Sequence, residues 1–429
     1  MVLLGISSCD CRKVEPEVVT YDHVAILYSV GRNDLEDNLD KNIRELANGN
    51  IPSAKDKDVM LIISQRFLIP SDTRGTFESS PYLIRLYKDK GKAVMDTLKA
   101  FPMHSNGGEI NLLSDPAVMS ETIATACNMF KSNSYGIIFS SHGSGWIPRG
   151  YYKNPVPPSS KALMSARKDS ETDKVLPEGA VDYVPLKRDP SLPKTKSFGE
   201  QLFIEGLRQM SLESDVVEMV KALPVHFDYI VMDACLMGTV EVAYEFRNAC
   251  DLLVVSPAEI LDHGFDYEPM GDRLFGRAKP DVVGIAEDYF NYYNSKSGAE
   301  RSATVTVVDC RQLEELASLC SKLFEKYSDK IAGVDPDRLG YYFSIPDRSW
   351  FYDLESLFIE SGISQSDKTE LEAVLDKVTP YRNSTKRILG FIDVGIYSGF
   401  SVYLPSMGDD YLDGYYRTLA WNKATGLVK

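Results

Sequence analysis

Long apolar segments are absent from this chain of 429 residues, and no apolar run reaches the ~20 residues that a membrane-spanning helix requires. An excess of positive charge is also absent, because 62 acidic against 47 basic side chains leave a net charge of −15. That balance argues against a nucleic-acid partner, which normally selects a basic surface. The seven cysteines show none of the spacings of a zinc site, and no internal repeat is apparent. These absences disfavour a membrane-spanning protein, a nucleic-acid-binding protein and a cysteine-based zinc module.

What remains is the composition of an ordinary globular protein, with 44% hydrophobic and 25% charged residues. The length suffices for one large domain or two moderate ones with a buried core. Free cysteine is common in the interior of such domains. We therefore interpret the cysteines within or beside predicted helices and strands as structural: Cys127, Cys250, Cys310 and Cys320.

Two short apolar runs each end beside a residue that can take part in catalysis. Residues 135–141 (YGIIFSS) lead into His142, and residues 227–232 (FDYIVM) are soon followed by Cys235. Short runs rich in β-branched and aromatic residues that stop at glycine indicate buried strands. In open parallel sheets, ligands bind where such strands end. The histidine and the cysteine can thus meet in one crevice, where the imidazole would generate and reprotonate the thiolate. This arrangement predicts a cysteine hydrolase.

Predicted strands and helices alternate along the first three quarters of the chain. Strands are expected at residues 23–30, 58–64, 135–141, 227–232, 252–256 and 303–309, with part of a hairpin at 82–87. Helices are expected at residues 33–47, 115–130, 214–223, 239–248 and 281–293. The alternation favours an α/β fold with a mostly parallel sheet covered by helices on both faces.

The chain changes character from residue 312 onward. Amphipathic helices are expected at residues 312–331 and 367–375, and residues 398–404 return to a strand pattern. We interpret residues 312–429 as a helical C-terminal subdomain. The pattern leaves open whether its last strand rejoins the main sheet or forms a small sheet of its own.

The insert at residues 149–197 lies between the two catalytic candidates and is rich in proline, serine and charge, with little periodicity. Structureless loops of this length are unusual in compact domains and are often functional. One interpretation is a solvated surface loop. The other is an activation or inhibitory loop that presents basic cleavage sites to the enzyme itself. Its basic residues include Lys153, Lys161, Arg167, Lys168, Lys174, Lys187, Arg188, Lys194 and Lys196.

The N-terminus, residues 1–20, carries a separate signal. A short apolar stretch ends in residues 6–9 (ISSC), which resemble a bacterial lipobox, where the cysteine is lipidated. The stretch is short and lacks the basic segment of a full signal peptide. The alternative is a frayed tail with incidental cysteines. We favour lipidation at Cys9, with residues 10–20 as a tether.

The segments HGSGW and DACLMG resemble those of the clostripain family of caspase-like cysteine peptidases. Further segments that resemble the family are SPAE followed by GFDY, and SGFSVYLP followed by residues 415–421. The resemblance therefore runs over most of the chain. It implies a caspase-like fold, with a mostly parallel sheet flanked by helices in a peptidase domain at residues 21–311 and the helical subdomain after it.

By this resemblance His142 is the catalytic base and acid, Cys235 is the nucleophile, and no third group is required. The backbone N–H groups of Gly143 and Cys235 are the expected oxyanion donors, and one such donor can contribute roughly 3 kcal/mol in the transition state. Taken singly, the histidine could cap a strand in the core, and the cysteine could be an inert buried thiol. The two motifs together favour catalysis.

Asp233 lies two positions before the cysteine, so both side chains share one face of a strand. In the family, the residue at this place lines the pocket for the side chain before the cut bond. A carboxylate there would pair with Arg, best through a bidentate contact, or with Lys. Glu259 and Asp262 are expected to add negative charge to the pocket, and Phe265 replaces a tryptophan that is frequent in the family. The alternative for Asp233 is a structural hydrogen-bond acceptor.

The sequence thus predicts a cysteine endopeptidase that cleaves proteins or peptides after Arg or Lys and processes its own insert, with Arg167 and Lys168 as the favoured site. No cofactor is expected; some relatives need calcium, but no acidic loop here has EF-hand spacing. The expected location is the bacterial cell envelope or the exterior, at a periplasmic or cell-surface position, with membrane contact only through a lipid at Cys9. The alternative is a catalytically silent envelope lipoprotein that binds peptides or glycans.

Overall fold

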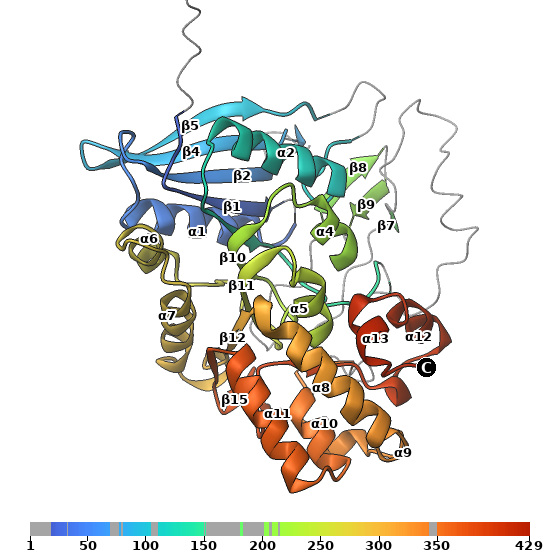
Figure 1. The fold of residues 1–429 in the computed structure, drawn as a ribbon. Helices are drawn as coiled ribbons and strands as arrows, with labels where there is room; N and C mark the ends of the chain where they lie inside the picture. Colours follow the sequence, from blue (N-terminus) through green and yellow to red (C-terminus); the bar gives the residue numbers. More distant parts are fainter. Residues whose placement is uncertain are drawn as a thin grey trace, which may run out of the picture.

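A central sheet organises the chain. The structure, a computed structural model, describes residues 19–31, 33–68, 77–78, 80–103, 110–149, 151, 181–182, 201–205, 208–212, 215–342 and 350–429. The sheet has ten strands in the order β14-β12-β11-β10-β6-β1-β2-β4-β5, with β3 (Phe77–Glu78) paired to β2 beside this path. Figure 1 shows it running through the molecule between layers of helices. The expected α/β fold with a mostly parallel sheet is confirmed.

The middle of the sheet is parallel, and its margins are antiparallel. The parallel strands are β1 (His23–Gly31), β2 (Asp58–Leu68), β6 (Tyr135–Ser140), β10 (Phe227–Asp233) and β11 (Cys250–Val255). The antiparallel strands are β4 (Tyr82–Asp89), β5 (Lys92–Ala100), β12 (Thr304–Asp309) and β14 (Tyr381–Ser384). Burial on both faces explains why the parallel strands read as continuous apolar runs. The expected hairpin is formed by β4 and β5.

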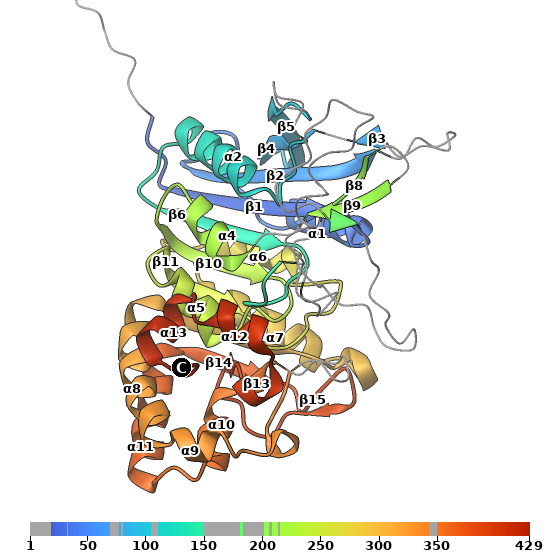
Figure 2. The same ribbon diagram turned by 90° about the vertical axis from the view of Figure 1, so that its right-hand side faces the viewer.

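Helices cover both faces of the sheet, as Figures 1 and 2 show from two sides. One row contains α1 (Glu36–Asn48), α6 (Tyr267–Phe275) and α7 (Val282–Asn294), which contact one another in that order. The other row contains α2 (Pro116–Met129), α4 (Val216–Ala222) and α5 (Val240–Phe246). Helix α2 begins where its sequence predicts. The Asp115 side chain accepts hydrogen bonds from the N–H groups of Ala117 and Val118, and Pro116 occupies the first turn.

The C-terminal region is mostly helical, as expected. It contains α8 (Leu313–Lys326), α9 (Ser328–Ile331), α10 (Leu354–Glu360), α11 (Gln365–Val378), α12 (Asp410–Tyr416) and α13 (Ala420–Thr425). The late strand β17 (Ser401–Val402) pairs with β13 (Tyr352–Asp353) in a small sheet of its own, whereas β14 joins the main sheet beside β12. The last strand therefore forms a small sheet of its own and does not rejoin the main sheet. The domain boundary at residue 312 stays a prediction.

Three short sheets complete the described structure. Besides β13 and β17, a hairpin joins β15 (Arg387–Ile388) to β16 (Ile392–Asp393). The third sheet has the order β7-β9-β8, formed by β7 (Val181–Asp182), β8 (Gln201–Glu205) and β9 (Arg208–Leu212). Among the described residues, no helix is both long enough and apolar enough to cross a membrane.

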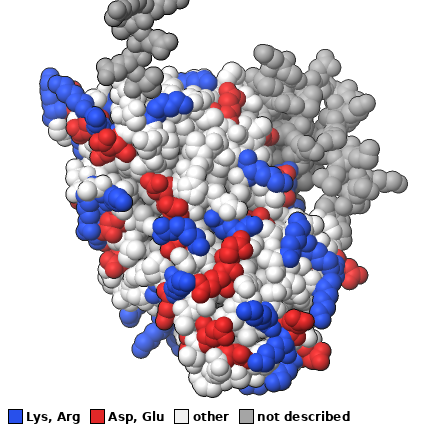
Figure 3. Space-filling view, viewed as in Figure 1, with Lys and Arg blue, Asp and Glu red and all other residues white. Residues whose placement is uncertain are grey.

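Surface charge is mixed in sign. On the face seen in Figure 3, acidic and basic side chains alternate over short distances. Many form ion pairs, such as Arg247 with Glu314 at 2.8 Å and Lys326 with Asp367 at 2.7 Å. Exposed pairs of this kind contribute about 0–1 kcal/mol each, so the fold depends mainly on its buried apolar core.

A buried histidine at the start of β1 makes the stability of the fold depend on pH. His23 lies within hydrogen-bond distance of the Ser134 hydroxyl at 2.9 Å and the Tyr229 hydroxyl at 3.1 Å. Burial lowers the pKa of His23 from 6.5 to about 4, against the opposing attraction of Asp228. The folded protein therefore holds this imidazole neutral where the unfolded chain takes up a proton.

We expect the free energy of unfolding to fall as the pH drops from about 6.5 towards 4, because only the unfolded state binds this proton in that range. The full effect of a shift of this size is about 3 kcal/mol. Urea unfolding of wild type and His23→Gln at pH 7.5 and 5 measures it, and the substitution should flatten the pH dependence. His226→Gln, at a half-exposed position, is the control. An equal pH dependence in wild type and His23→Gln would contradict this account.

Candidate active site

The ends of strands β6 and β10 lie level with each other at the carboxyl edge of the sheet. These parallel neighbours are in a register that sets Ser140 opposite Asp233. His142 and Cys235 each follow two positions later, so they leave adjacent strand ends together. Gly143 fits against the backbone of Cys235 so closely that a Cβ on the glycine would lie 2.0 Å from the Cys235 carbonyl oxygen. Glycine is therefore required here, and the two motifs form one site.

The turn after the cysteine is held in an unusual conformation. Leu236 has a φ of 61°, in the left-handed region that non-glycine residues seldom occupy. Its N–H donates to the Ala258 carbonyl at 3.1 Å, and the N–H of Gly238 donates to the Ser256 carbonyl at 2.8 Å. Such strain persists only where the surrounding structure enforces it, and it is found most often at functional sites. The next loop thus fixes the chain direction at Cys235.

The sulfur of Cys235 contacts Ile260, in the segment where two acidic candidates lie. Sγ of Cys235 accepts a hydrogen bond from the N–H of Ile260 at 3.2 Å and donates to the carbonyl of the same residue at 3.5 Å. Glu259 is buried, and half-buried Asp262 accepts a hydrogen bond from the Asn38 side chain at 2.9 Å. Cys235 itself is 0% exposed. A substrate can therefore reach the thiol only after neighbouring groups move.

His142 has an acidic neighbour that the sequence did not reveal. Its Nε2 lies 2.7 Å from the Oδ1 of Asp34, whose side chain is 72% exposed, whereas that of His142 is only 7% exposed. Asp34 follows β1, and β1 is the sheet neighbour of β6. An acidic residue three positions after the end of the neighbouring strand was the available signal. Recognising it required the strand order, which the sequence alone does not give. A carboxylate at this distance can orient the imidazole.

Asp233 is buried among hydroxyl groups and aromatic rings. Its Oδ2 accepts hydrogen bonds from the Ser140 hydroxyl at 2.8 Å and from the Tyr267 hydroxyl at 2.7 Å. Burial, together with the nearby Asp233 carboxylate, raises the pKa of Tyr267 and of Tyr289 well above the usual range. Both phenols therefore stay protonated, and Tyr267 acts as a donor.

Helix α7 and the loop before α6 form an aromatic layer close to this carboxylate. The ring of Phe265 stacks on that of Tyr289 at 4.4 Å between centroids, and Tyr289 packs edge-on against Tyr293 at 5.0 Å. The Tyr289 hydroxyl is buried and has no hydrogen-bond partner among the residues that the structure describes. Neither tyrosine was singled out in the sequence, because helical spacing alone does not distinguish a pocket wall from the core.

The loop that carries His142 is anchored by the C-terminal region. Trp146, in the same motif, is fully buried and meets the rings of Tyr403 and Tyr416, each at 4.9 Å. The Tyr416 hydroxyl donates to the buried carboxylate of Glu241 at 2.6 Å. Two segments distant in the sequence thus hold the histidine loop in place.

Other candidates from the sequence fall elsewhere. Arg167, Lys168 and Cys9 lie outside the described residues. Within the described part of the chain, no group of three or more histidine, cysteine or acidic side chains is arranged to hold a metal ion. The four cysteines interpreted as structural are buried free thiols: Cys127, Cys250, Cys310 and Cys320.

A mostly parallel α/β sheet with a histidine and a cysteine on adjacent strand ends is the arrangement expected of a caspase-like cysteine peptidase. The chain belongs to the clostripain family, peptidase family C11, whose model matches residues 27–163 and 211–386. The resemblance identified in the sequence is thereby confirmed.

Individual relatives are distant. Clostripain from Hathewaya histolytica is 24% identical over 254 residues, a match that covers 58% of this chain but only 41% of clostripain. An inactive zymogen C11 protease from Parabacteroides distasonis superposes with a TM-score of 0.70 at 22% identity, covering 95% of this chain and 99% of that one. A secreted C11 cysteine protease from Bacteroides thetaiotaomicron, solved with an irreversible peptide inhibitor, gives 0.69 at 22% identity, with coverages of 94% and 98%. These structures share the fold of this chain.

Proposed function

We propose that this protein is an endopeptidase in which Cys235 is the nucleophile and His142 is the general base and acid. The observation that carries the proposal is the register of β6 and β10, which sets the two motifs side by side at the carboxyl edge of the sheet. The close fit of Gly143 against the Cys235 backbone supports it, because no side chain larger than hydrogen is accommodated there.

In the proposed mechanism, the Cys235 thiolate attacks the carbonyl carbon of the scissile peptide bond. The N–H groups of Gly143 and Cys235 donate to the oxyanion that forms. The imidazolium of His142 then protonates the leaving amine, and an acyl-enzyme remains. Water, deprotonated by the same imidazole, hydrolyses the thioester and regenerates the thiol. The enforced turn at Leu236 would keep the cysteine N–H and sulfur in fixed positions during both steps.

Asp34 is proposed to orient His142 during these proton transfers. Because Asp34 is mostly exposed, its interaction is worth at most about 1 kcal/mol. We therefore expect Asp34→Ala to lower kcat by about fivefold with little change in KM. Steady-state hydrolysis of a peptide substrate measures this, with Asp37→Ala, an exposed acidic residue of α1, as the control. Equal kcat values in wild type and Asp34→Ala would remove Asp34 from the mechanism.

We propose that the enzyme cleaves after Arg or Lys, with Asp233 as the acidic group of the specificity pocket. The Ser140 and Tyr267 hydroxyls orient its carboxylate. The stacked rings of Phe265 and Tyr289 are buried near this carboxylate, and opening of the site would present an aromatic wall that suits a planar guanidinium. Glu259 and Asp262 flank the contact with the cysteine sulfur and would add to the negative potential.

Maturation by cleavage within residues 149–197 is part of the proposal. Both Asp233 and Cys235 are completely buried, so a substrate needs an opening step before it can bind. The insert contains many basic residues, and an enzyme specific for Arg or Lys would cut it. Arg167 and Lys168 are the proposed site. The C11 protease from Parabacteroides distasonis was solved as an inactive zymogen, which supports activation by cleavage in this family.

The proposed location is the cell envelope or the exterior, with a lipid at Cys9 as the only membrane anchor. One relative of the same fold is described as a secreted protease, and its inhibitor is a peptide. Substrates are proposed to be proteins or peptides that expose Arg or Lys. Mass spectrometry of the N-terminal peptide from membrane fractions tests the anchor, and an unmodified Cys9 within a longer chain would contradict it.

Covalent labelling tests the site directly. A thiol-reactive peptidyl-arginine probe should modify Cys235 in the processed protein, and matched probes ending in Asp or Leu should not. After both proteins are nicked with trypsin, His142→Ala should be labelled more slowly than wild type, with the fold unchanged. If folded, processed protein takes up none of the probes, the silent binding lipoprotein becomes the better description.

A further inference from the structure

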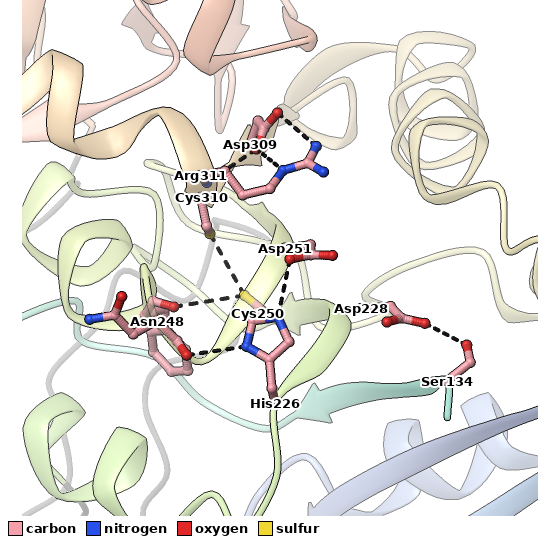
Figure 4. Close-up of polar contacts among 10 residues, drawn as sticks. Ser134, His226, Asp228, Asn248, Cys250, Asp251, Asp309, Cys310 and Arg311 are labelled. Atoms are coloured by element: carbon pink, nitrogen blue, oxygen red, sulfur yellow. Dashed lines mark hydrogen bonds and ion pairs between the residues drawn. The ribbon is translucent and has the colours of Figure 1, made fainter. Parts of the chain in front are cut away.

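A second pair of reactive groups lies apart from the proposed active site. The sulfur atoms of Cys250 and Cys310 are 3.7 Å apart. Figure 4 draws the contact between them. Cys250 is the first residue of β11, and Cys310 directly follows β12. Both side chains are buried, with 1% and 2% exposure. Two thiols in contact within the interior can be joined by a covalent bond if an oxidant reaches them.

The pair lies at the edge of the sheet opposite to the catalytic one. Cys250 opens β11, whereas the proposed nucleophile follows the end of β10, which runs parallel to β11. The residues next to the pair are at the surface: His226 contacts Asp251 at 3.1 Å, and Arg311 contacts Asp309 at 2.8 Å. Figure 4 shows these ion pairs beside the two sulfurs. Opening of this strand end would therefore expose both thiols to a reagent.

Neighbouring ends of β11 and β12 bring the two sulfurs into contact. Strands β11 and β12 are antiparallel with Leu252 opposite Asp309, so residues 250 and 310 are diagonal neighbours just beyond the paired positions. A disulfide has an S–S length of about 2.05 Å, so each sulfur must move by less than about 1 Å from the observed 3.7 Å separation. Rotation about the side-chain bonds provides a shift of that size.

We propose that Cys250 and Cys310 form a structural disulfide when the chain folds in an oxidising compartment. One thiolate attacks a small or protein disulfide donor and releases one donor thiol. The second thiolate then attacks the mixed disulfide and releases the other donor thiol. Two cysteine thiols are thus oxidised, one donor disulfide is reduced, and the two protons pass to the donor thiolates. This inference does not depend on the proposed catalytic activity.

Timing follows from burial. Desolvation, together with the neighbouring Cys310, raises the pKa of Cys250 well above that of an ordinary thiol. Since the thiolate is the reacting form, the pair reacts slowly once the fold has closed. The bond therefore forms during folding, while the ends of the two strands are still open, and then persists.

The cross-link would join the two ends of a segment that contributes to the proposed active site. The two cysteines are 60 positions apart, and the segment between them includes residues 259–262, α6 and α7, which supply the contact with the Cys235 sulfur and the aromatic layer near Asp233. A disulfide would tie both ends of this unit together at its base. For a loop of this length in a chain of this size, we expect Tm to rise by about 5 °C.

The full chain carrying Cys235→Ala, which prevents self-cleavage, is suited to the test. It is refolded with reduced and oxidised glutathione or with reductant alone, alkylated and mapped by mass spectrometry. We expect one cross-linked peptide joining Cys250 to Cys310 and a Tm about 5 °C higher after oxidation. Cys310→Ser should abolish both results, and Cys320→Ser, at a buried cysteine in α8, should retain them.

Three outcomes would overturn the proposal. They are free thiols at both positions in correctly folded, glutathione-treated protein, a disulfide that joins either residue to another cysteine, and a Tm unchanged by the bond. If Cys310→Ser does not fold, mapping of the chain that retains both cysteines still decides the question.

Discussion

Replacing Cys235 by alanine is expected to abolish peptide hydrolysis and cleavage within residues 149–197, with kcat reduced by about 10⁴-fold or more. Without the thiolate no acyl-enzyme forms, and the remaining N–H donors stabilise only a slow direct attack by water. His142→Ala should have an effect of similar size, because the neutral thiol is a weak nucleophile and the leaving amine loses its proton donor. Initial rates and the intact mass of purified protein measure the two losses.

The double substitution separates a joint mechanism from two independent effects. Since the two side chains act as a unit, the double variant should be no slower than either single variant. Cys127→Ala, at a buried cysteine in α2, is the matched control and should keep full activity. Retention of rapid hydrolysis or of insert cleavage by purified Cys235→Ala would show that a different group is the nucleophile.

Asp233→Asn is expected to lower kcat/KM for Arg substrates by about 10³-fold, because a buried cation would lose its counter-charge at a cost of about 4 kcal/mol. This substitution separates the charge of Asp233 from its role as a hydrogen-bond acceptor. Asparagine retains an oxygen that can accept from the Ser140 and Tyr267 hydroxyls, so the local hydrogen bonds can persist while the charge is lost. Steady-state kinetics with peptides ending in Arg and Lys measure the effect.

Tyr267→Phe and Ser140→Ala test the opposite change. Each removes one hydrogen bond to Asp233 but leaves the charge of the Asp233 carboxylate in place. Each should lower the free energy of unfolding by about 1–3 kcal/mol. Each should reduce kcat/KM for Arg substrates much less than Asp233→Asn does. If Asp233→Asn instead lowers Tm while leaving Arg turnover within about tenfold of wild type, Asp233 is the structural acceptor that the sequence left as an alternative.

Much of the fold was accessible from the sequence, because its strands are short apolar runs with clear ends. The runs before His142 and Cys235 predicted two buried strands, and these are β6 and β10. The direction of β12 was not predicted: it alternates with helices like the parallel strands, yet it pairs antiparallel with β11. Direction depends on how the preceding helix and loop return to the sheet, which local periodicity does not encode.

The candidate site was predicted less completely, since part of it is built by contacts between distant segments. Asp34 reaches His142 only because β1 lies beside β6, and Trp146 is held by rings from the last thirty residues of the chain. The left-handed conformation of Leu236 had no signal at all, because a residue with a side chain normally argues against it. Motifs identified the reacting residues, and only the tertiary structure identified the groups that hold them.

The most direct test of the account is hydrolysis of matched fluorogenic peptides ending in Arg, Lys, Asp or Leu by wild-type protein. The account predicts turnover of the Arg or Lys peptides alone, accompanied on a denaturing gel by cleavage between residues 149 and 197, and loss of both in Cys235→Ala. Turnover of the Asp or Leu peptides would contradict the role of Asp233 in specificity. Absence of all turnover, even after addition of calcium and reductant and after nicking with trypsin, would contradict the central claim that this protein is a peptidase.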